Sequence, residues 1–329
     1  MKNRSTIILS GRDVKKLVDM RTGISAVERV FGEYAAGRTQ MPAKIYVDLK
    51  EYEGDFRAMP AYVSRLKACT LKWVNVHARN PGRGLPTVMA VIILSDPTNG
   101  YPLSIMDGTY ITGLRTGAAG AVAAKYLARK DSAVVSLVGC GVQARTQLDA
   151  LKEIFRIKEV RVWGHQPVLV SSFIKDMRPA RLNMVTTRNV KDCVKGGDIV
   201  VTTTPSRRPI VKLAWLKKGV HINAIGADAK GKQELDHAIL RKAKIVVDDW
   251  VQASHSGEIN VAIRKKIITK RNIYAALGDI VAGRKRGRVS PDEITVFDST
   301  GLAIQDTVIA QLIYKTALKL KVGRKTVLI

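Results

Sequence analysis

The sequence predicts an α/β protein that combines a parallel-sheet domain with a second domain of the α+β type. Three observations lead to this class. Short apolar runs alternate with helical segments in the middle of the chain, strand-like segments follow one another near its start, and a glycine loop joins one apolar run to the next helix. The 329 residues suffice for about two domains, which we place at 1–123 with 302–329 (α+β) and at 124–301 (parallel sheet).

The parallel sheet is predicted from the apolar runs of the middle region. The run Ser132–Val138, which is followed by glycine, is typical of a strand buried on both faces. Helices are expected at Val142–Phe155, whose apolar residues share one face, and near Val168–Met177. Such alternation implies a parallel sheet covered on both faces. Further strands are expected at Glu159–Trp163, Asn183–Thr186, Asp198–Thr204, His221–Gly226 and Lys244–Asp248.

The first part of the chain and its end predict the α+β domain. Residues 12–36 have the apolar spacing of a helix, and a long helix is expected from Leu302 to about Leu320. After Pro42, loops with Gly or Pro separate strand-like segments, as antiparallel strands require. These segments are Lys44–Val47, Phe56–Met59, Leu71–Val74 and Thr87–Leu94.

The formal net charge of +27 narrows the possible partners. Nucleic acid would suit such a charge, but the basic residues are scattered along the chain and the few aromatic residues do not alternate with them. We therefore favour a basic enzyme with an anionic ligand over a nucleic-acid-binding protein. No apolar stretch approaches the roughly 20 residues that cross a bilayer, and the run Ile7–Leu9 is too short for a signal peptide, so we expect a cytoplasmic protein with no membrane partner.

The cysteines and histidines predict no metal site. Cys69, Cys140 and Cys193 are odd in number and lack metal-ligand spacing, and the five histidines form no ligand pair. Cys140 lies inside the glycine loop, where a small side chain is the simple explanation.

The glycine loop Gly139-x-Gly141-x-x-Ala144 predicts dinucleotide binding in a Rossmann domain. The first glycine allows the tight turn, the second lets the backbone approach a pyrophosphate, and the small third residue permits close helix–strand packing. Phosphates then lie at the helix N-terminus, where unpaired N–H groups favour anions. A glycine pattern alone is weak evidence, and the alternative is a tight turn without a ligand, but the strand–loop–helix context favours a nicotinamide cofactor.

The acidic residue that would bind the adenosine ribose at the end of the second strand is missing. Gly164 stands where that carboxylate is expected, followed by His165. Loss of the acid removes repulsion of a 2′-phosphate, which His165 or a nearby Arg could contact. The cofactor is therefore NAD or NADP, with a slight preference for NADP.

Isolated basic residues on the strand-like segments are candidates for substrate chemistry. Lys72 lies between apolar neighbours, where burial without a partner is costly and lowers the pKa of an amine. Arg57 could hold a carboxylate with two hydrogen bonds. Asp228 directly follows a predicted strand, at the sheet edge where ligands bind. The alternatives are that the basic residues lie on an ordinary basic surface and that Asp228 caps a helix or lies in a turn.

Together these segments resemble the ornithine cyclodeaminase/mu-crystallin family, and within it the archaeal-type alanine dehydrogenases. The resemblance extends nearly from end to end and is specific at the level of the family, because many motifs occur in one order. They are Gln40–Lys44, Phe56–Ala61, Leu71–Asn75, Gly84–Val88, Leu114–Ala118, Gly139–Ala144, Thr202–Ser206, Ile222–Asp228 and Phe297–Gly301.

The resemblance implies a homodimer formed through the α+β domain and the C-terminal helix. It implies that Lys44 and Arg57 bind the carboxylate of an amino acid, that Lys72 is the acid/base, and that Asp228 is its partner. Besides Gly139 and Gly141, the residues that match family positions near the cofactor are Thr87, Arg115, Gln143, Ala144, Lys232 and Ser299. Gly164 departs from relatives that use NAD and carry an acid there.

Several activities are consistent with one such site. The first is oxidation of an amino acid such as alanine, with hydride transfer from Cα to the nicotinamide. The second is cyclodeamination of ornithine or lysine, in which the side-chain amine attacks the imine. The third is reduction of a cyclic imine such as pyrroline-2-carboxylate. Outside this class stands a non-catalytic nucleotide-binding protein, against which the presence of Lys72, Arg57 and Asp228 together argues.

Overall fold

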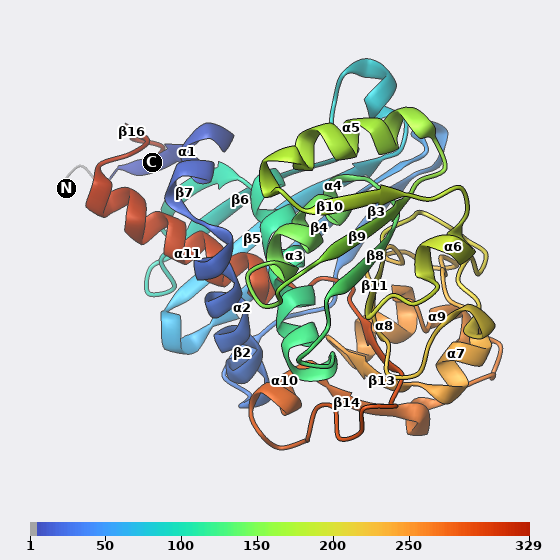
Figure 1. Cartoon of the computed structure of the whole chain (residues 1–329). Helices are drawn as coiled ribbons and strands as arrows, with labels where there is room; N and C mark the ends of the chain where they lie inside the picture. Colours follow the sequence, from blue (N-terminus) through green and yellow to red (C-terminus); the bar gives the residue numbers. More distant parts are fainter. Residues whose placement is uncertain (1–4) are drawn as a thin grey trace. The chain divides into compact units, whose positions relative to one another are not determined.

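The computed structural model describes residues 5–329, which divide into two compact units (Figure 1). Unit 1 contains the described residues up to Arg115 together with Leu302–Ile329, and unit 2 contains Thr116–Gly301. The first division falls inside helix α3 (Thr109–Leu127), earlier than the boundary that we expected after residue 123. None of the helices in these residues is both long and apolar enough to cross a membrane.

Unit 2 is built on an eight-stranded sheet in the order β10-β9-β8-β11-β12-β15-β13-β14, and every pairing in it is parallel. The predicted α/β class with a parallel sheet is confirmed. The sequence correctly indicated six of these strands but not β14 or β15. The strands are β8 (Val134–Val138), β9 (Glu159–Trp163), β10 (Asn183–Thr186), β11 (Ile199–Thr202), β12 (His221–Ala224), β13 (Lys244–Val247), β14 (Ile273–Ala276) and β15 (Thr295–Asp298).

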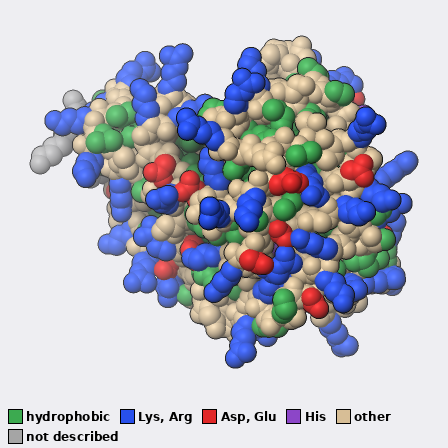
Figure 2. Space-filling model, viewed as in Figure 1, with side chains coloured by type: hydrophobic (Ala, Val, Ile, Leu, Met, Phe, Trp, Pro, Cys, Tyr) green, Lys and Arg blue, Asp and Glu red, His purple; other side chains and the backbone are tan. Residues whose placement is uncertain are grey.

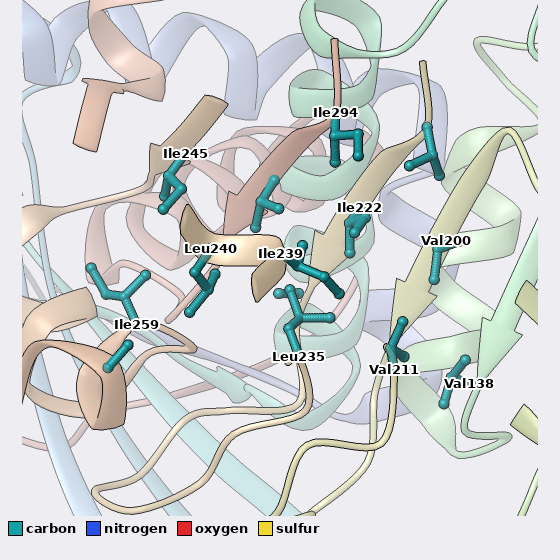
Figure 3. Close-up of a cluster of buried hydrophobic side chains, with 14 of the residues drawn as sticks. Val138, Val200, Val211, Ile222, Leu235, Ile239, Leu240, Ile245, Ile259 and Ile294 are labelled. Atoms are coloured by element: carbon teal, nitrogen blue, oxygen red, sulfur yellow. The ribbon is translucent and has the colours of Figure 1, made fainter. Parts of the chain in front are cut away.

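Helices cover both faces of this sheet, because alternate residues of each strand enter different cores. On β11, Ile199 and Val201 pack with helices α4 and α5, whereas Val200 packs on the opposite face with α7 (Figure 3). Burial of such apolar side chains stabilises the fold by about 1.5–3 kcal/mol each. The helices of the unit are α4 (Val142–Leu151), α5 (Pro167–Met177), α6 (Val190–Val194), α7 (His237–Lys242), α8 (Trp250–Ser256), α9 (Asn260–Arg264) and α10 (Leu277–Val281).

Unit 1 contains a second eight-stranded sheet, in the order β16-β1-β7-β6-β5-β4-β2, with β3 also paired to β4. Its pairings are antiparallel except that of β1 with β7, as the short Gly- and Pro-containing loops predict. The strands are β1 (Thr6–Leu9), β2 (Thr39–Gln40), β3 (Ile45–Leu49), β4 (Gly54–Val63), β5 (Ala68–His77), β6 (Val88–Ser95), β7 (Pro102–Asp107) and β16 (Arg324–Thr326).

Helices pack against one face of this sheet. The long helix α11 (Ala303–Leu320) contacts β4, β5 and β6 as well as α2. The helix that we predicted over residues 12–36 is two helices, α1 (Gly11–Leu17) and α2 (Met20–Ala35). The break occurs because the side chain of Asp19 accepts a hydrogen bond from the N–H of Thr22 and starts a new helix.

Candidate active site

The alternation of β5 places Lys72 on the buried face of the unit 1 sheet. Its neighbours Leu71 and Trp73 point to the other face and are 38% and 43% exposed, whereas Lys72 is entirely buried. An isolated buried ammonium would be strongly destabilising, so the lysine requires a partner. That partner is Asp306 in the first turn of α11, whose Oδ2 lies 2.7 Å from Lys72 Nζ.

Asp306 also holds Arg115, one of the residues predicted to lie near the cofactor. Arg115 Nε lies 3.3 Å from Asp306 Oδ1, and Arg115 Nη1 donates to Gln305 Oε1 at 3.2 Å. The three side chains are almost entirely buried. The amide nitrogen of Gln305 is buried and has no hydrogen-bond partner among the described residues, so the cluster contains a donor suited to a ligand's acceptor.

Burial lowers the pKa of Lys72 to about 7. The charge of Asp306 opposes this shift, while the positive charges of Arg115 and Lys44 add to it. An amine with a pKa near neutrality exchanges protons readily at physiological pH, which is what a general acid/base requires. Lys44 therefore belongs to the same electrostatic environment as Lys72.

Arg57 shares the buried face of the sheet with Lys72. It lies on β4 opposite Val74, while Lys72 lies opposite Met59, and residues opposite each other in antiparallel strands share a face. Arg57 is 5% exposed and forms two hydrogen bonds with Asp55, of 2.6 and 2.9 Å. This doubly bonded pairing fixes the plane of the guanidinium.

The glycine loop of unit 2 has the geometry that a dinucleotide needs. Gly139 has a φ of +113°, and a Cβ there would collide with Thr203. Gly141 is the N-cap residue of α4, whose first turn has no side-chain cap among the described residues, and a Cβ on Gly141 would meet open space, so the backbone there is accessible. Ala144 is completely buried, which allows close packing of α4 on the sheet. Gln143 is partly exposed at the start of α4 and accepts from the hydroxyl of Thr146.

The structure gives a physical reason for the glycine at position 164. A Cβ on Gly164 would lie 2.5 Å from Cys140 Sγ and 2.8 Å from Val170 Cγ2. The thiol of Cys140, which is 7% exposed, thus fills the space in which an acidic side chain would begin. The presence of Cys140 in the glycine loop therefore explains why position 164 has no acidic side chain.

The remaining predicted residues, Asp228, Ser299 and Thr87, lie near the ends of strands. Asp228 follows β12 and forms an ion pair of 2.6 Å with Lys232. Ser299 follows β15, and its buried hydroxyl has no hydrogen-bond partner in residues 5–329. Thr87 precedes β6, where its carbonyl oxygen accepts from the N–H of His77 at 2.8 Å. Asp228 and Lys72 belong to different units, so their partnership stays a prediction.

A buried glutamate that sequence reasoning missed holds the loop that carries Asp228. Glu234 Oε1 accepts from the N–H and the hydroxyl of Thr204 at 2.6 and 2.7 Å, and Oε2 accepts from the N–H of Gly226 at 3.0 Å. The carboxylate thereby connects the segments after β11 and β12. Burial raises the pKa of Glu234 to about 7.

Asp306 and Asp55 were also missed, although the sequence contained a signal for each. Asp306 is the only acidic residue in the helix predicted from Leu302 to about Leu320, and a lysine predicted to be buried must have an acidic partner. Asp55 precedes Arg57 by two residues on one strand, which puts both side chains on one face. No three or more His, Cys, Asp or Glu side chains within residues 5–329 are arranged to hold a metal ion.

Comparison with known proteins agrees with this geometry over the whole chain. Residues 4–321 match the model of the ornithine cyclodeaminase/mu-crystallin family. The chain belongs to this family. It is 50% identical over 322 residues to an alanine dehydrogenase of Archaeoglobus fulgidus, covering 97% of this chain and 98% of that protein.

Two solved structures resemble the whole fold. An archaeal alanine dehydrogenase dimer with bound NAD superimposes with a TM-score of 0.95 at 48% identity, covering 99% of this chain and 100% of the other. A Thermococcus litoralis Δ1-pyrroline-2-carboxylate reductase with NADH and L-proline also gives 0.95, at 37% identity and with 98% and 100% covered. The predicted family is confirmed, as is the prediction of an enzyme of the dehydrogenase and reductase type that these relatives represent.

Proposed function

We propose that the protein is an NAD(P)-dependent amino-acid dehydrogenase that converts L-alanine, NAD(P)+ and water into pyruvate, ammonium, NAD(P)H and a proton. The observation that carries the proposal is the buried Lys72, whose pKa is lowered to about 7, on the same sheet face as Arg57. The high identity to an alanine dehydrogenase supports alanine as the substrate.

The cofactor fits the residues that are present. The accessible N-terminus of α4 suits a pyrophosphate, and the hydroxyl of Ser299, which has no hydrogen-bond partner among the described residues, suits a further hydrogen bond to the cofactor. When bound, the nicotinamide accepts the hydride from the substrate Cα. We propose that the residues holding it are Thr87, Arg115, Gly139, Gly141, Gln143, Ala144, Lys232 and Ser299.

The side chains of the protein then supply orientation and proton transfer. Arg57 and Lys44 bind the substrate carboxylate, because a guanidinium and an ammonium both pair with such an anion. Neutral Lys72 accepts a proton from the substrate amine as hydride leaves Cα, and an imine results. Asp228 assists the addition of water to this imine, after which ammonia leaves.

Turnover with a panel of substrates tests the proposal. Alanine, ornithine, lysine and proline are each incubated with NAD or NADP, while reduced nicotinamide is followed by absorbance and products are analysed. Alanine should give reduced cofactor and pyruvate. Proline or pipecolate formed without net reduced cofactor would instead show cyclodeamination. Tight cofactor binding without any turnover would overturn the enzymatic proposal in favour of a non-catalytic nucleotide-binding protein.

Replacement of Lys72 tests the residue that carries the proposal. Lys72→Met keeps the volume of the side chain and should abolish turnover while leaving cofactor affinity unchanged, because the acid/base is lost but the glycine loop is not. Lys16→Met, at an exposed lysine of α1, is the matched control and should retain full activity. Turnover retained in Lys72→Met would remove Lys72 from the mechanism.

Reduction of a cyclic imine is the second candidate, and one observation favours it. The pyrroline-2-carboxylate reductase superimposes as well as the alanine dehydrogenase does, although its sequence identity is lower. Faster oxidation of NAD(P)H with pyrroline-2-carboxylate than with pyruvate and ammonium would favour this activity.

We also propose that NADP is used at least as well as NAD. Gly164 leaves the end of β9 without a carboxylate, so a 2′-phosphate meets no repulsion there. The KM values for the two cofactors at one alanine concentration decide the point, and a much lower KM for NAD would contradict the proposal.

We propose finally that the protein is a homodimer that assembles through the outer face of the unit 1 sheet. A row of directly paired residues on this face runs from Ile45 through Ala58 and Trp73 to Val91, and three of these side chains are 62%, 43% and 47% exposed. Phe56 stacks on Trp73 with 5.1 Å between ring centroids. An exposed apolar patch of this kind marks an interaction surface, and the related alanine dehydrogenase is a dimer.

Light scattering after size-exclusion chromatography tests this assembly. Trp73→Glu should yield monomers, because a charge would be buried without a partner at the centre of the patch. Val251→Glu, at an exposed apolar residue of α8 in unit 2, should leave the dimer intact. A monomeric parent protein, or a dimeric Trp73→Glu variant, would contradict this interface.

A further inference from the structure

We propose that Asp306 is a positioning residue that holds Lys72 for proton transfer and keeps Arg115 as a permanent counterion. The proposal depends on the function of Lys72 proposed above. Asp306 is 1% exposed, and its two carboxylate oxygens contact different cations, Oδ2 the ammonium of Lys72 and Oδ1 the guanidinium of Arg115. No role for Asp306 follows from the motifs of the sequence, because its partners lie far away along the chain.

The position of Asp306 is fixed by packing around it. The next residue, Thr307, shares a hydrogen bond of 2.6 Å with Thr70 of β5, and both hydroxyls are buried. Thr70 precedes Lys72 by two residues and therefore lies on the same face of the strand. Two successive residues of α11 thus contact two successive inward-facing residues of β5, so that neither the helix nor the carboxylate can shift along the strand.

The second cation explains how Lys72 can lose its proton inside the protein. A buried Lys–Asp pair alone would leave an isolated carboxylate each time the lysine became neutral, which is strongly unfavourable. Here Asp306 also pairs with the side chain of Arg115, and a guanidinium is a permanent cation in proteins. The charged groups that act on Lys72 are Asp306 on α11, Arg115 on α3 and Lys44 before β3. Lys72 can therefore alternate between ammonium and amine while the carboxylate stays neutralised.

The proposal predicts a shift of the Lys72 titration when Asp306 loses its charge. The carboxylate raises the pKa of Lys72 against the effect of burial, so Asp306→Asn should lower it. An opposite charge within about 4–6 Å typically changes a pKa by about 1–3 units. The pH at which alanine oxidation reaches half its maximal kcat/KM should therefore fall by about one unit or more. Asp306→Glu, which keeps the charge, should restore the parental midpoint.

A second readout does not require turnover. Acetylation of Lys72 by trace acetic anhydride, quantified in the Lys72 peptide by mass spectrometry between pH 5.5 and 9.5, follows the neutral amine directly. Its midpoint should lie near 7 in the parent protein and should fall in Asp306→Asn. Ser104→Ala is the matched control, since it breaks a buried hydrogen bond of the same unit, from the hydroxyl of Ser104 to the carbonyl of Ile7, that involves neither Asp306 nor Lys72. It should leave both midpoints unchanged.

The outcomes separate this proposal from the proposed function. A shifted acetylation midpoint in a protein that turns over no amino acid would support the role of Asp306 and reject the dehydrogenase. Turnover with unchanged midpoints in Asp306→Asn would reject the positioning role and leave the dehydrogenase standing. Equal shifts in Asp306→Asn and Ser104→Ala would show a merely structural effect and overturn the proposal.

Discussion

Gly164 shows how one residue affects both packing and ligand choice. Its hydrogen faces the thiol of Cys140, which occupies the start of the path that an acidic side chain would follow. The sequence revealed the missing acid, but the reason for it lies in a contact between two loops. Position 164 therefore cannot be converted to an NAD-type acid unless Cys140 changes as well.

This coupling predicts the result of a double-mutant cycle. Gly164→Ala should lower the thermal midpoint by several degrees, since a Cβ 2.5 Å from the sulfur forces the loop to move and overpacking typically costs about 1–3 kcal/mol. Cys140→Ala/Gly164→Ala should recover part of that loss, because the sulfur is gone. Calorimetry of the four proteins measures the coupling. Additive effects would contradict a direct contact between the two side chains.

At the scale of single elements, the periodic strands and the helices with one apolar face were predictable. β9 and β10 have the predicted boundaries, because turn-forming or polar residues follow each of these short segments. Helix α3 was not predicted, because from Ile111 to Ala124 it is buried all round and has no polar face. A buried helix and a buried strand have similar sequences.

Local sequence patterns also reveal only part of the candidate site. Lys72, Arg57 and Asp228 are conspicuous by residue type and local pattern, whereas Asp306 and Glu234 become meaningful only through their contacts. Asp306 is separated from Lys72 by 234 positions, and Glu234 acts on the N–H groups of two other loops. Periodicity contains no information about such tertiary pairings, so the residues that position the site are harder to find than those that perform the chemistry.

Glu234 leads to a prediction about the loops after β11 and β12. Burial raises the pKa of Glu234 from 4.5 to about 7. The carboxylate of Glu258 accepts a hydrogen bond from the N–H of Glu234, and the pKa of Glu258 is raised by burial and by the charge of Glu234. When the pKa of an acid is higher in the folded state than in the unfolded state, the unfolded chain binds fewer protons than the folded chain at pH values between the two pKa values. The free energy of unfolding therefore falls as the pH increases through this range. The contribution of Glu234 is present below about pH 4.5 and is lost as pH rises through about 7.

Thermal unfolding of the parent protein and of Glu234→Gln across pH 4–8 measures this contribution. The difference in midpoint, parent minus variant, should decrease with rising pH, because glutamine does not titrate. Using the difference removes the pH dependence of the many surface charges. A difference that is constant, or that increases with pH, would show that Glu234 is ionised at low pH in the folded protein. The variant should also lower kcat if the Asp228 loop needs this connection.

For the molecule as a whole, the net charge of +27 is the property that no single site explains. Figure 2 shows Lys and Arg side chains spread over the visible face rather than gathered in one patch, with fewer Asp and Glu between them. A distributed charge of this kind attracts anions from a distance and repels itself in the compact state. Both effects are screened by salt, but they change binding and stability in opposite directions.

Raising the NaCl concentration from about 10 to about 150 mM shortens the Debye length from about 30 to about 8 Å. Binding of NADPH, followed by fluorescence, should weaken, and more than binding of NADH, because NADPH has the larger negative charge. The KM for alanine, which is zwitterionic, should change much less. Over the same range the thermal midpoint should rise, because self-repulsion of the folded chain is screened. If cofactor affinity did not respond to salt while the midpoint rose, the positive charge would act on stability alone and would not attract the cofactor.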